Sequence, residues 1–237
     1  MAHFAQSPSF ILHQVTCQFA TGDTLFGPLS FSLEPSLCAL VGRNGSGKTR
    51  LLRLLAGLDE PASGHIERTG TYVYVAQQQD ILPHTTLAEL LGYEAIFAAR
   101  ARIDSGDYQP DDLEMLDGFW DLAERLGEAF ARAKLPPFDP DKPAGELSGG
   151  ERIRALLCGA FTAEADFLLL DEPTNHLDRQ GRAWFYDQLA RYQGGVLVAS
   201  HDRELLAQVP RILELSSGGL RSYGGNYADY QTQRDAE

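Results

Sequence analysis

Short hydrophobic runs bounded by turn-forming residues recur along the chain. Residues 38–41, 167–170 and 195–200 are each almost entirely apolar. A continuous apolar run of this length predicts a strand that is buried on both faces, as in a parallel sheet. Residues 10–31 instead alternate apolar and polar positions, with glycine-containing turns, and this pattern predicts antiparallel strands. Residues 64–67 and 71–75 add further β pattern.

A helical spacing replaces the strand pattern from residue 86 to about residue 134. Its apolar positions include Leu113, Leu116, Trp120, Ala123 and Leu126. Prolines at 136, 137 and 140 end this region, and a second helix is predicted to open near residue 148. The aromatic residues Tyr93, Phe97, Phe119 and Trp120 are expected to be core anchors rather than partner contacts.

These patterns predict an α/β fold in a single domain over residues 1–237. Its core would be a mostly parallel sheet with flanking helices. An antiparallel β subdomain and a helical insertion at about residues 87–159 would be attached to that core.

A glycine-rich segment follows the strand at 38–41 and precedes a helical pattern at 50–56. It reads Gly42-Arg43-Asn44-Gly45-Ser46-Gly47-Lys48-Thr49, a full match to G-x-x-x-x-G-K-[ST]. Glycines let backbone N–H groups turn towards phosphate oxygens, and the helix N-terminus adds partial positive charge. Lys48 would contact the β- and γ-phosphates, and Thr49 would offer a hydroxyl to Mg²⁺. The segment predicts a P-loop site for a nucleoside triphosphate such as ATP.

Two carboxylates, Asp171 and Glu172, follow the strand at 167–170. Open α/β sheets bind ligands beyond the carboxyl ends of their strands. One carboxylate can hold Mg²⁺ while the next orients or deprotonates a water molecule. An acidic pair after a strand is also typical of an ordinary turn, and it is the phosphate loop that favours the chemical interpretation.

Composition indicates a soluble, intracellular globular protein, and we expect it in the cytoplasm. No run approaches 18 apolar residues, so no membrane span is predicted, and the N-terminus lacks the pattern of a secretory signal. The three cysteines, Cys17, Cys38 and Cys158, are expected to be small core residues. The formal net charge of −13 argues against strong nucleic-acid binding by this chain alone.

A second glycine-containing motif, Leu147-Ser148-Gly149-Gly150-Glu151, lies upstream of the acidic pair. By itself it is also typical of a flexible helix start. Together with the phosphate loop, it makes the chain resemble the ATP-binding cassette (ABC) family, whose signature begins Leu-Ser-Gly-Gly. Ser148 can cap a helix, and the bare glycine backbone lets that positive helix end approach a γ-phosphate. In the family this end faces the phosphate loop of a second cassette, so the resemblance implies that each ATP is closed between two domains.

The resemblance also implies roles for residues outside these motifs. Phe19 would stack on adenine, with a core phenylalanine as the alternative. Gln77 would sense Mg²⁺ and the attacking water, although Gln78 and Gln79 leave the register open by a residue. His201 would contact the γ-phosphate, with a surface imidazole as the alternative.

The complete set of implied site residues is as follows. The implied catalytic residues are Lys48, Gln77, Glu172 and His201, and the implied Mg²⁺ ligands are Thr49, Gln77 and Asp171. The residues implied to contact ATP bound to the same chain are Phe19, Gly42, Arg43, Asn44, Gly45, Ser46, Gly47, Lys48, Thr49 and Arg50. The residues implied to contact ATP bound to the partner cassette are Ser148, Gly149, Gly150, Glu151 and Asp178.

Residues 174–178 and 200–203, with the later segment 223–230, look like those of the ABC-F subfamily. Members of that subfamily have two cassettes on one polypeptide and no membrane domain, and they act on the ribosome as translation or antibiotic-resistance factors. This chain has one phosphate loop and one signature, so it resembles the N-terminal half of such a protein. Its expected partner is a second cassette, either the other half or another copy.

Two other functions stay open on the sequence. One is the ATP-binding subunit of a membrane transporter, and the other is a nucleotide-binding regulator that does not hydrolyse ATP. The segment from Asp104 to Glu146 carries twelve acidic and four basic residues. Such a segment is repelled by RNA phosphates, so we expect it to contact protein or simply solvent.

Overall fold

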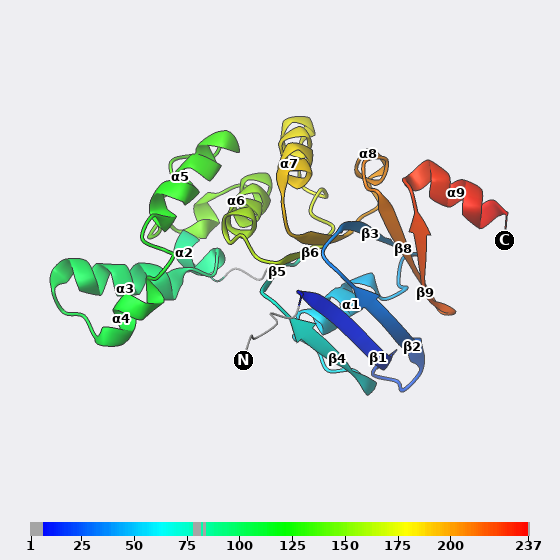
Figure 1. Ribbon diagram of the computed structural model, residues 1–237. Helices are drawn as coiled ribbons and strands as arrows, with labels where there is room; N and C mark the ends of the chain where they lie inside the picture. Colours follow the sequence, from blue (N-terminus) through cyan, green and yellow to red (C-terminus); the bar gives the residue numbers. More distant parts are fainter. Residues whose placement is uncertain (1–6, 78–81, 83, 237) are drawn as a thin grey trace. The chain divides into compact units, whose positions relative to one another are not determined.

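The computed structural model describes residues 7–77, 82 and 84–236 (Figure 1). The chain forms two compact units. The first, which we call the core unit, comprises Met1–Gln77, Glu164–Asn175 and Leu189–Glu237. The second, which we call the helical unit, comprises Gln78–Ala163 and His176–Gln188.

A six-stranded sheet forms the centre of the core unit, in the order β5-β6-β7-β3-β8-β9. The strands are β5 (Tyr72–Val75), β6 (Phe167–Asp171), β7 (Gly195–Ala199), β3 (Leu37–Val41), β8 (Arg211–Ser216) and β9 (Gly219–Gly224). The first five are parallel, and β9 pairs antiparallel with β8. All residues of β6 and β7 are buried, as their continuous apolar runs require. The predicted parallel sheet is confirmed.

A three-stranded antiparallel sheet with the order β2-β1-β4 completes the β structure of the core unit. Its strands are β1 (Ser9–Gln18), β2 (Thr24–Leu33) and β4 (Ser63–Thr69). Helix α1 (Lys48–Leu55) buries its leucines in the same hydrophobic core as β1, β2, β3 and β6. The rings of Phe10 and Phe167 meet edge to face in this core, 4.8 Å between centroids. One core therefore holds both sheets and α1 in place. Two helices, α8 (Arg203–Leu206) and α9 (Tyr227–Asp235), complete the unit.

The helical unit contains helices over residues 87–132, where a helical pattern was predicted, and a helix that begins next to Ser148, as was also predicted. Its helices are α2 (Leu87–Leu90), α3 (Glu94–Ser105), α4 (Pro110–Met115), α5 (Leu122–Arg132), the 3₁₀ turn η1 (Ala144–Glu146), α6 (Gly149–Thr162) and α7 (Arg179–Arg191), of which residues up to Gln188 belong to this unit. Helix α7 was not predicted. Tyr93, Leu122 and Leu126 form a small core, with Phe97 and Phe119 packed against it.

The expectation that Trp120 is a core anchor is wrong. The sequence pattern from Leu113 to Leu126 is divided between α4 and α5, and Gly118 has a left-handed φ of +78° between them. The break ends the helical periodicity before Trp120, which is 50% exposed. Leu113, on α4, is 43% exposed. The Arg100 guanidinium lies over the Trp120 ring, 5.4 Å from its centroid.

The remaining predictions from composition concern cysteines and membranes. Cys17, Cys38 and Cys158 are all buried and unpaired, as expected for core residues. Among the described residues, no helix combines the length and the apolar character that a bilayer crossing requires.

Full burial of β6 leads to a stability prediction. Leu169 is completely buried, whereas Leu58 is 54% exposed. We expect Leu169→Ala to lower the free energy of unfolding by about 2–5 kcal/mol, because it removes transfer energy and leaves a cavity. Leu58→Ala, the matched control, should change it by less than about 0.5 kcal/mol. Urea denaturation followed by circular dichroism measures both, and equal losses would contradict the packing described for β6.

Candidate active site

The phosphate loop connects β3 to α1 through two glycines in left-handed conformations, Gly45 at φ +81° and Gly47 at φ +98°. A Cβ on Gly47 would lie 2.7 Å from the Phe26 ring of β2, so the core requires a glycine there. Lys48 begins α1, and its Nζ donates a hydrogen bond of 3.1 Å to the Gly42 carbonyl. The ammonium group is thereby held over the loop.

Lys48 is only 9% exposed. Burial lowers the pKa of its ammonium group, because desolvation disfavours the charged form, and Glu172 and Asp171 oppose this change. The Lys48 ammonium therefore lies close enough to two carboxylates to interact with them electrostatically. These are Asp171, the last residue of β6, and Glu172, which follows it.

Asp171 ends β6 with a side chain that is 1% exposed. Neither of its carboxylate oxygens has a hydrogen-bond partner among the described residues. Burial raises the pKa of the carboxyl group, while Thr49, Lys48 and Tyr74 lower it. Two buried oxygens without a donor are costly unless a cation or a donor meets them. The donor set of this carboxylate with the Thr49 hydroxyl fits a hard divalent cation such as Mg²⁺.

Glu172 adopts a left-handed φ of +49°, which is rare for a residue with a side chain. Its N–H donates to the Ala199 carbonyl of β7 at 2.9 Å, and its carbonyl accepts from the Asn175 N–H at 3.2 Å. These bonds hold the backbone in the unusual conformation. Burial raises the pKa of the Glu172 carboxyl, mainly against the influence of His201 and Lys48.

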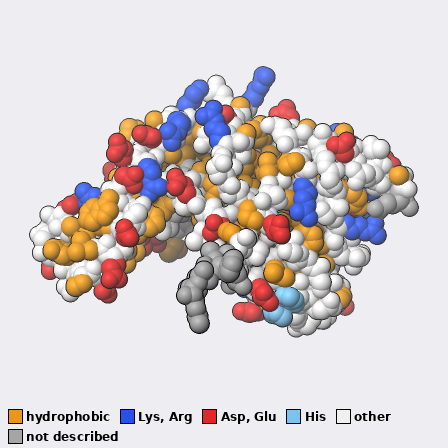
Figure 2. All heavy atoms as spheres, viewed as in Figure 1, with side chains coloured by type: hydrophobic (Ala, Val, Ile, Leu, Met, Phe, Trp, Pro, Cys, Tyr) orange, Lys and Arg blue, Asp and Glu red, His pale blue; other side chains and the backbone are white. Residues whose placement is uncertain are grey.

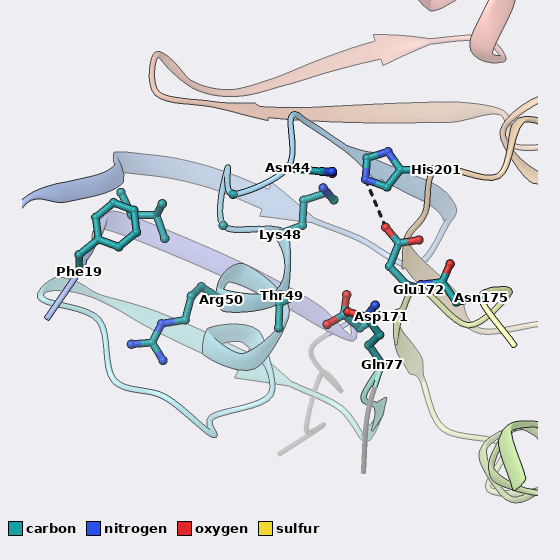
Figure 3. Close-up of a pocket in the computed structure, with 13 residues that line it drawn as sticks. Phe19, Asn44, Lys48, Thr49, Arg50, Gln77, Asp171, Glu172, Asn175 and His201 are labelled. Carbon is teal, nitrogen blue, oxygen red and sulfur yellow. Dashed lines mark ion pairs between the residues drawn. The ribbon is translucent and has the colours of Figure 1, made fainter. Parts of the chain in front are cut away.

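His201 follows the end of β7 and lies opposite Glu172. Its Nε2 is 3.4 Å from the Glu172 Oε1 (Figure 3). The preceding Ser200 is fully buried, and its Oγ accepts a hydrogen bond of 3.1 Å from the Asp202 N–H. Asp202 in turn caps α8, so the turn that carries the imidazole is fixed at both ends.

These side chains line one pocket of about 560 Å³ within the core unit. Its lining is Phe19, Leu25, Asn44, Gly45, Gly47, Lys48, Thr49, Arg50, Gln77, Asp171, Glu172, Asn175 and His201. Phe19 and Arg50 lie at one end of the pocket, and Glu172, Asn175 and His201 lie at the other (Figure 3). An apolar ring at one end and a cluster of charges at the other match the two ends of a nucleotide.

Most of the predicted residues of the core unit are therefore brought together, with some exceptions. Gly42 and Arg43 line a neighbouring pocket of about 360 Å³ that also contains Tyr227 and Tyr230. Ser46 lines neither of these two pockets. Phe19 is 51% exposed, so it is not a core residue. Gln78 and Gln79, the alternatives to Gln77, lie outside the described residues.

The signature residues belong to the helical unit and are not part of this pocket's lining. Ser148 caps α6, with its Oγ accepting from the Glu151 N–H at 3.3 Å. The Glu151 carboxylate accepts from the Ser148 N–H and O–H at 2.9 Å and 2.7 Å, which lowers the pKa of Glu151. This reciprocal capping box is the predicted helix start, and it leaves the positive end of α6 well defined.

The other signature positions have local structural roles of their own. A Cβ added to Gly150 would lie 2.9 Å from the His176 carbonyl oxygen, so this close approach requires glycine. A Cβ added to Gly149 would have no atom within 4 Å. Asp178 precedes α7 and its Oδ1 accepts from the Gly181 N–H at 2.7 Å.

Three residues in or next to this pocket were missed by sequence reasoning. Leu25 and Asn175 line the pocket, and Tyr74 acts on the pKa of Asp171. Asn175 stands only four residues after Asp171 and lies within the segment 174–178 that resembles the ABC-F subfamily, and both signals could have identified it. Leu25 lies on β2, and its position at the loop depends on the sheet pairing rather than on any local motif.

Comparison with family models identifies one match. The model described as ABC transporter matches residues 26–175.

Curated relatives align along most of this chain. The energy-dependent translational throttle protein EttA of Mycobacterium tuberculosis is 35% identical, over 95% of this chain and 41% of its own length. The tylosin resistance ATP-binding protein TlrC of Streptomyces fradiae is 31% identical, over 98% of this chain and 46% of its own. ABC transporter F family member 5 of Arabidopsis thaliana is 31% identical, over 87% of this chain and 28% of its own. The chain thus spans less than half the length of each of these relatives.

Among solved structures, an ATP-binding subunit of an ABC transporter superposes with a TM-score of 0.73 at 18% identity. The superposition covers 95% of this chain and 93% of the other. At this identity the likeness shows the shared fold.

Proposed function

The chain belongs to the ABC transporter family, and from this membership we propose that it is an ATPase cassette of the ABC-F type that binds ATP with Mg²⁺ and hydrolyses it. One observation carries the proposal. A single pocket gathers the loop lysine Lys48, the partnerless carboxylate of Asp171, the strained Glu172 and His201. Phosphoryl transfer requires this combination of a cation, a metal ligand and a group that positions water.

ATP would lie along the pocket with its phosphates on the loop. Backbone N–H groups of residues 42–49 and the Lys48 ammonium would hold the β- and γ-phosphates. Phe19 lies exposed at the other end, where its ring is free to stack on adenine. Arg50 flanks the same end and is held by Asp59, with Nη1 to Oδ2 at 2.7 Å.

The residues that would hold Mg²⁺ are Asp171, Thr49 and Gln77. Bound there, the ion would neutralise charge on the phosphates. The buried oxygens of Asp171, which have no hydrogen-bond partner among the described residues, support this assignment. Lys48 adds positive charge on the same side.

Glu172 would position the water that attacks the γ-phosphorus and would accept its proton. The water oxygen forms the new P–O bond as the bond to ADP breaks, so the products are ADP and inorganic phosphate. A raised pKa suits a carboxylate for this role, because the base is then a better proton acceptor. His201, next to Glu172, would stabilise charge on the phosphoryl group during transfer.

A second cassette would complete the site. The chain offers the N-terminal end of α6, with Ser148, Gly149, Gly150 and Glu151, as a surface for the γ-phosphate bound to a partner. Asp178, just before α7, would lie at the same partner interface. The partner is either another cassette of a longer polypeptide or another copy of this chain.

We place this ATPase in the cytoplasm, acting on the ribosome in translation or in antibiotic resistance. The names of two relatives, a translational throttle protein and a tylosin resistance protein, support this setting. The ATP-binding subunit of a membrane transporter is the alternative.

Co-sedimentation tests the cellular role. A tagged Glu172→Gln chain should bind ATP without turning it over, and we expect it to pellet with ribosomes several-fold more when ATP is present. The matched control combines Glu172→Gln with Lys48→Ala, which should abolish the ATP-dependent part. Recovery in the membrane fraction would favour the transporter alternative. Equal pelleting of both variants would contradict an ATP-driven ribosomal role.

A further inference from the structure

A cluster of two histidines and a glutamate lies on the three-stranded sheet, apart from the nucleotide pocket. His13 of β1 is directly opposite His65 of the edge strand β4, and Glu67 follows two positions later on β4. Side chains two positions apart on a strand share one face, so all three project from the same side. Histidine side chains gather beside acidic ones over this sheet in Figure 2.

The nitrogens of both histidines converge on one oxygen. The Glu67 Oε1 is 3.0 Å from the His13 Nε2 and 3.7 Å from the His65 Nε2. One ligand atom from each residue lies within 4.8 Å of the other two, and the rings stack with centroids 4.4 Å apart. Tetrahedral zinc bonds of about 2.0–2.2 Å place neighbouring ligand atoms about 3.4 Å apart. The distances from the Glu67 Oε1 to the His13 Nε2 and to the His65 Nε2, 3.0 Å and 3.7 Å, lie just below and just above that spacing.

The contact between His13 and Glu67 is not a conventional hydrogen bond. The His13 Nε2 is buried and has no hydrogen-bond partner, even though the Glu67 oxygen is only 3.0 Å away. A buried ring nitrogen is ordinarily hydrogen-bonded or bound to a metal. Two ligands of one ion lie close together without pointing at each other, because each directs its lone pair at the ion. A separation of 3.0 Å between the His13 Nε2 and the Glu67 Oε1, without hydrogen-bond geometry, is compatible with such a pair of ligands.

The backbone beneath the cluster is built to fix the histidines. The register of β1 and β4 shifts directly after His13, and Gln14 has a φ of +50°, so β1 carries a bulge at this point. Gly64 lies against the bulge, where an added Cβ would be 2.3 Å from the His13 carbonyl oxygen. Bulges re-aim side chains and recur next to functional sites. Here the bulge begins directly after His13, which is still paired with His65.

We propose that His13, His65 and Glu67 form a binding site for a divalent transition-metal ion of the Zn²⁺ type. Imidazole ligands suit such ions, whereas Mg²⁺ and Ca²⁺ prefer oxygen ligands throughout. Three protein ligands leave one position for water. A bound ion joins β4, the edge strand, to β1, so it stabilises the β2-β1-β4 sheet.

Zinc titration of the metal-stripped full chain tests this site. By isothermal calorimetry near neutral pH, we expect one Zn²⁺ per chain to bind at the cluster. His13→Ala and His65→Ala should each weaken it roughly 10–100-fold or more, since losing a ligand costs at least as much as losing an outer-shell partner. Glu67→Gln should also weaken it. His84→Ala, which removes an exposed histidine of the helical unit, is the matched control and should bind as the unaltered chain does.

A thermal measurement separates this site from zinc capture by the nucleotide pocket. Saturating Zn²⁺ should raise the Tm of the unaltered chain and of His84→Ala, but not that of the double variant His13→Ala/His65→Ala. All three ligands are partly exposed, so the variants are expected to fold. The proposal is overturned if the double variant binds Zn²⁺ as tightly as the unaltered chain, or if Zn²⁺ raises the Tm of the double variant by the same amount.

Discussion

Glu172→Gln is expected to slow ATP hydrolysis by roughly 10²–10⁴-fold while leaving ATP binding nearly unchanged. The amide is nearly the same size as the carboxylate, so the left-handed backbone and its bonds to Ala199 and Asn175 are retained. What would be lost is the carboxylate that we propose as the acceptor of the proton of the attacking water. In the proposed function, binding depends on the phosphate loop and on the Lys48 ammonium, both of which the substitution leaves in place.

Single-turnover phosphate release and the binding of a fluorescent ATP analogue separate these two effects. Glu34→Gln, which neutralises an exposed carboxylate outside the pocket, is the matched control and should change neither. The pH profile adds a second readout. Because burial raises the pKa of Glu172 above its ordinary value of 4.5, turnover should fall on the acid side at a higher pH than for an exposed glutamate. That acid limb should disappear in Glu172→Gln, and a normal rate in this variant would remove Glu172 from the chemical step.

Mixing two inactive variants determines whether the site is shared between copies. Ser148→Arg blocks the end of α6 but keeps Glu172, whereas Glu172→Gln keeps the end of α6. If ATP is closed between two chains, a mixed pair contains one intact composite site, so activity should reappear on mixing. If the mixture is as inactive as its components, two copies of this chain do not share ATP in this way.

Lys48→Ala is expected to weaken ATP binding itself, by roughly 10–100-fold, because a hydrogen bond between charged groups contributes about 1.5–3 kcal/mol. The loss has a further electrostatic reason. Lys48 is the cation beside Asp171 and Glu172 that acts on both of their pKa values, and without it those carboxylates face the phosphates with less compensation. Calorimetry with MgATP measures the change.

Lys142→Ala is the matched control for this prediction. Its ammonium pairs with Glu146 at 3.6 Å in the helical unit and does not line the pocket. The affinity of Lys142→Ala for MgATP should equal that of the unaltered chain. Equal affinities for the Lys48 and Lys142 variants would show that the loop backbone alone holds the nucleotide.

Several features of the site follow from short, contiguous stretches of sequence. The phosphate loop, the acidic pair and the capping box at Ser148 are each formed by residues that are close together in the sequence. Local conformation determines them: glycines allow the left-handed angles of the loop, and a serine three positions before a glutamate starts a helix. The strand at Phe167–Asp171 was also predictable, because its continuous apolar run fits only a buried environment.

Other features could not be derived from local pattern. Trp120 was expected in the core, but a glycine break between α4 and α5 turns it outwards, where it packs under Arg100. The pocket position of Leu25 depends on β2 meeting the loop, and the requirement for glycine at position 47 comes from the ring of Phe26. In each case the deciding neighbour is distant in sequence.

The sequence by itself determined which residues we propose for the nucleotide site, because most of them belong to short motifs whose backbone conformation is set by neighbouring residues. Only the tertiary structure decided which distant side chains meet. It left the oxygens of Asp171 buried without partners, and it placed His13 against His65 across a bulged strand pair. The physical reason is that strand register and burial are properties of the assembled sheet, in which residues far apart in the chain become neighbours.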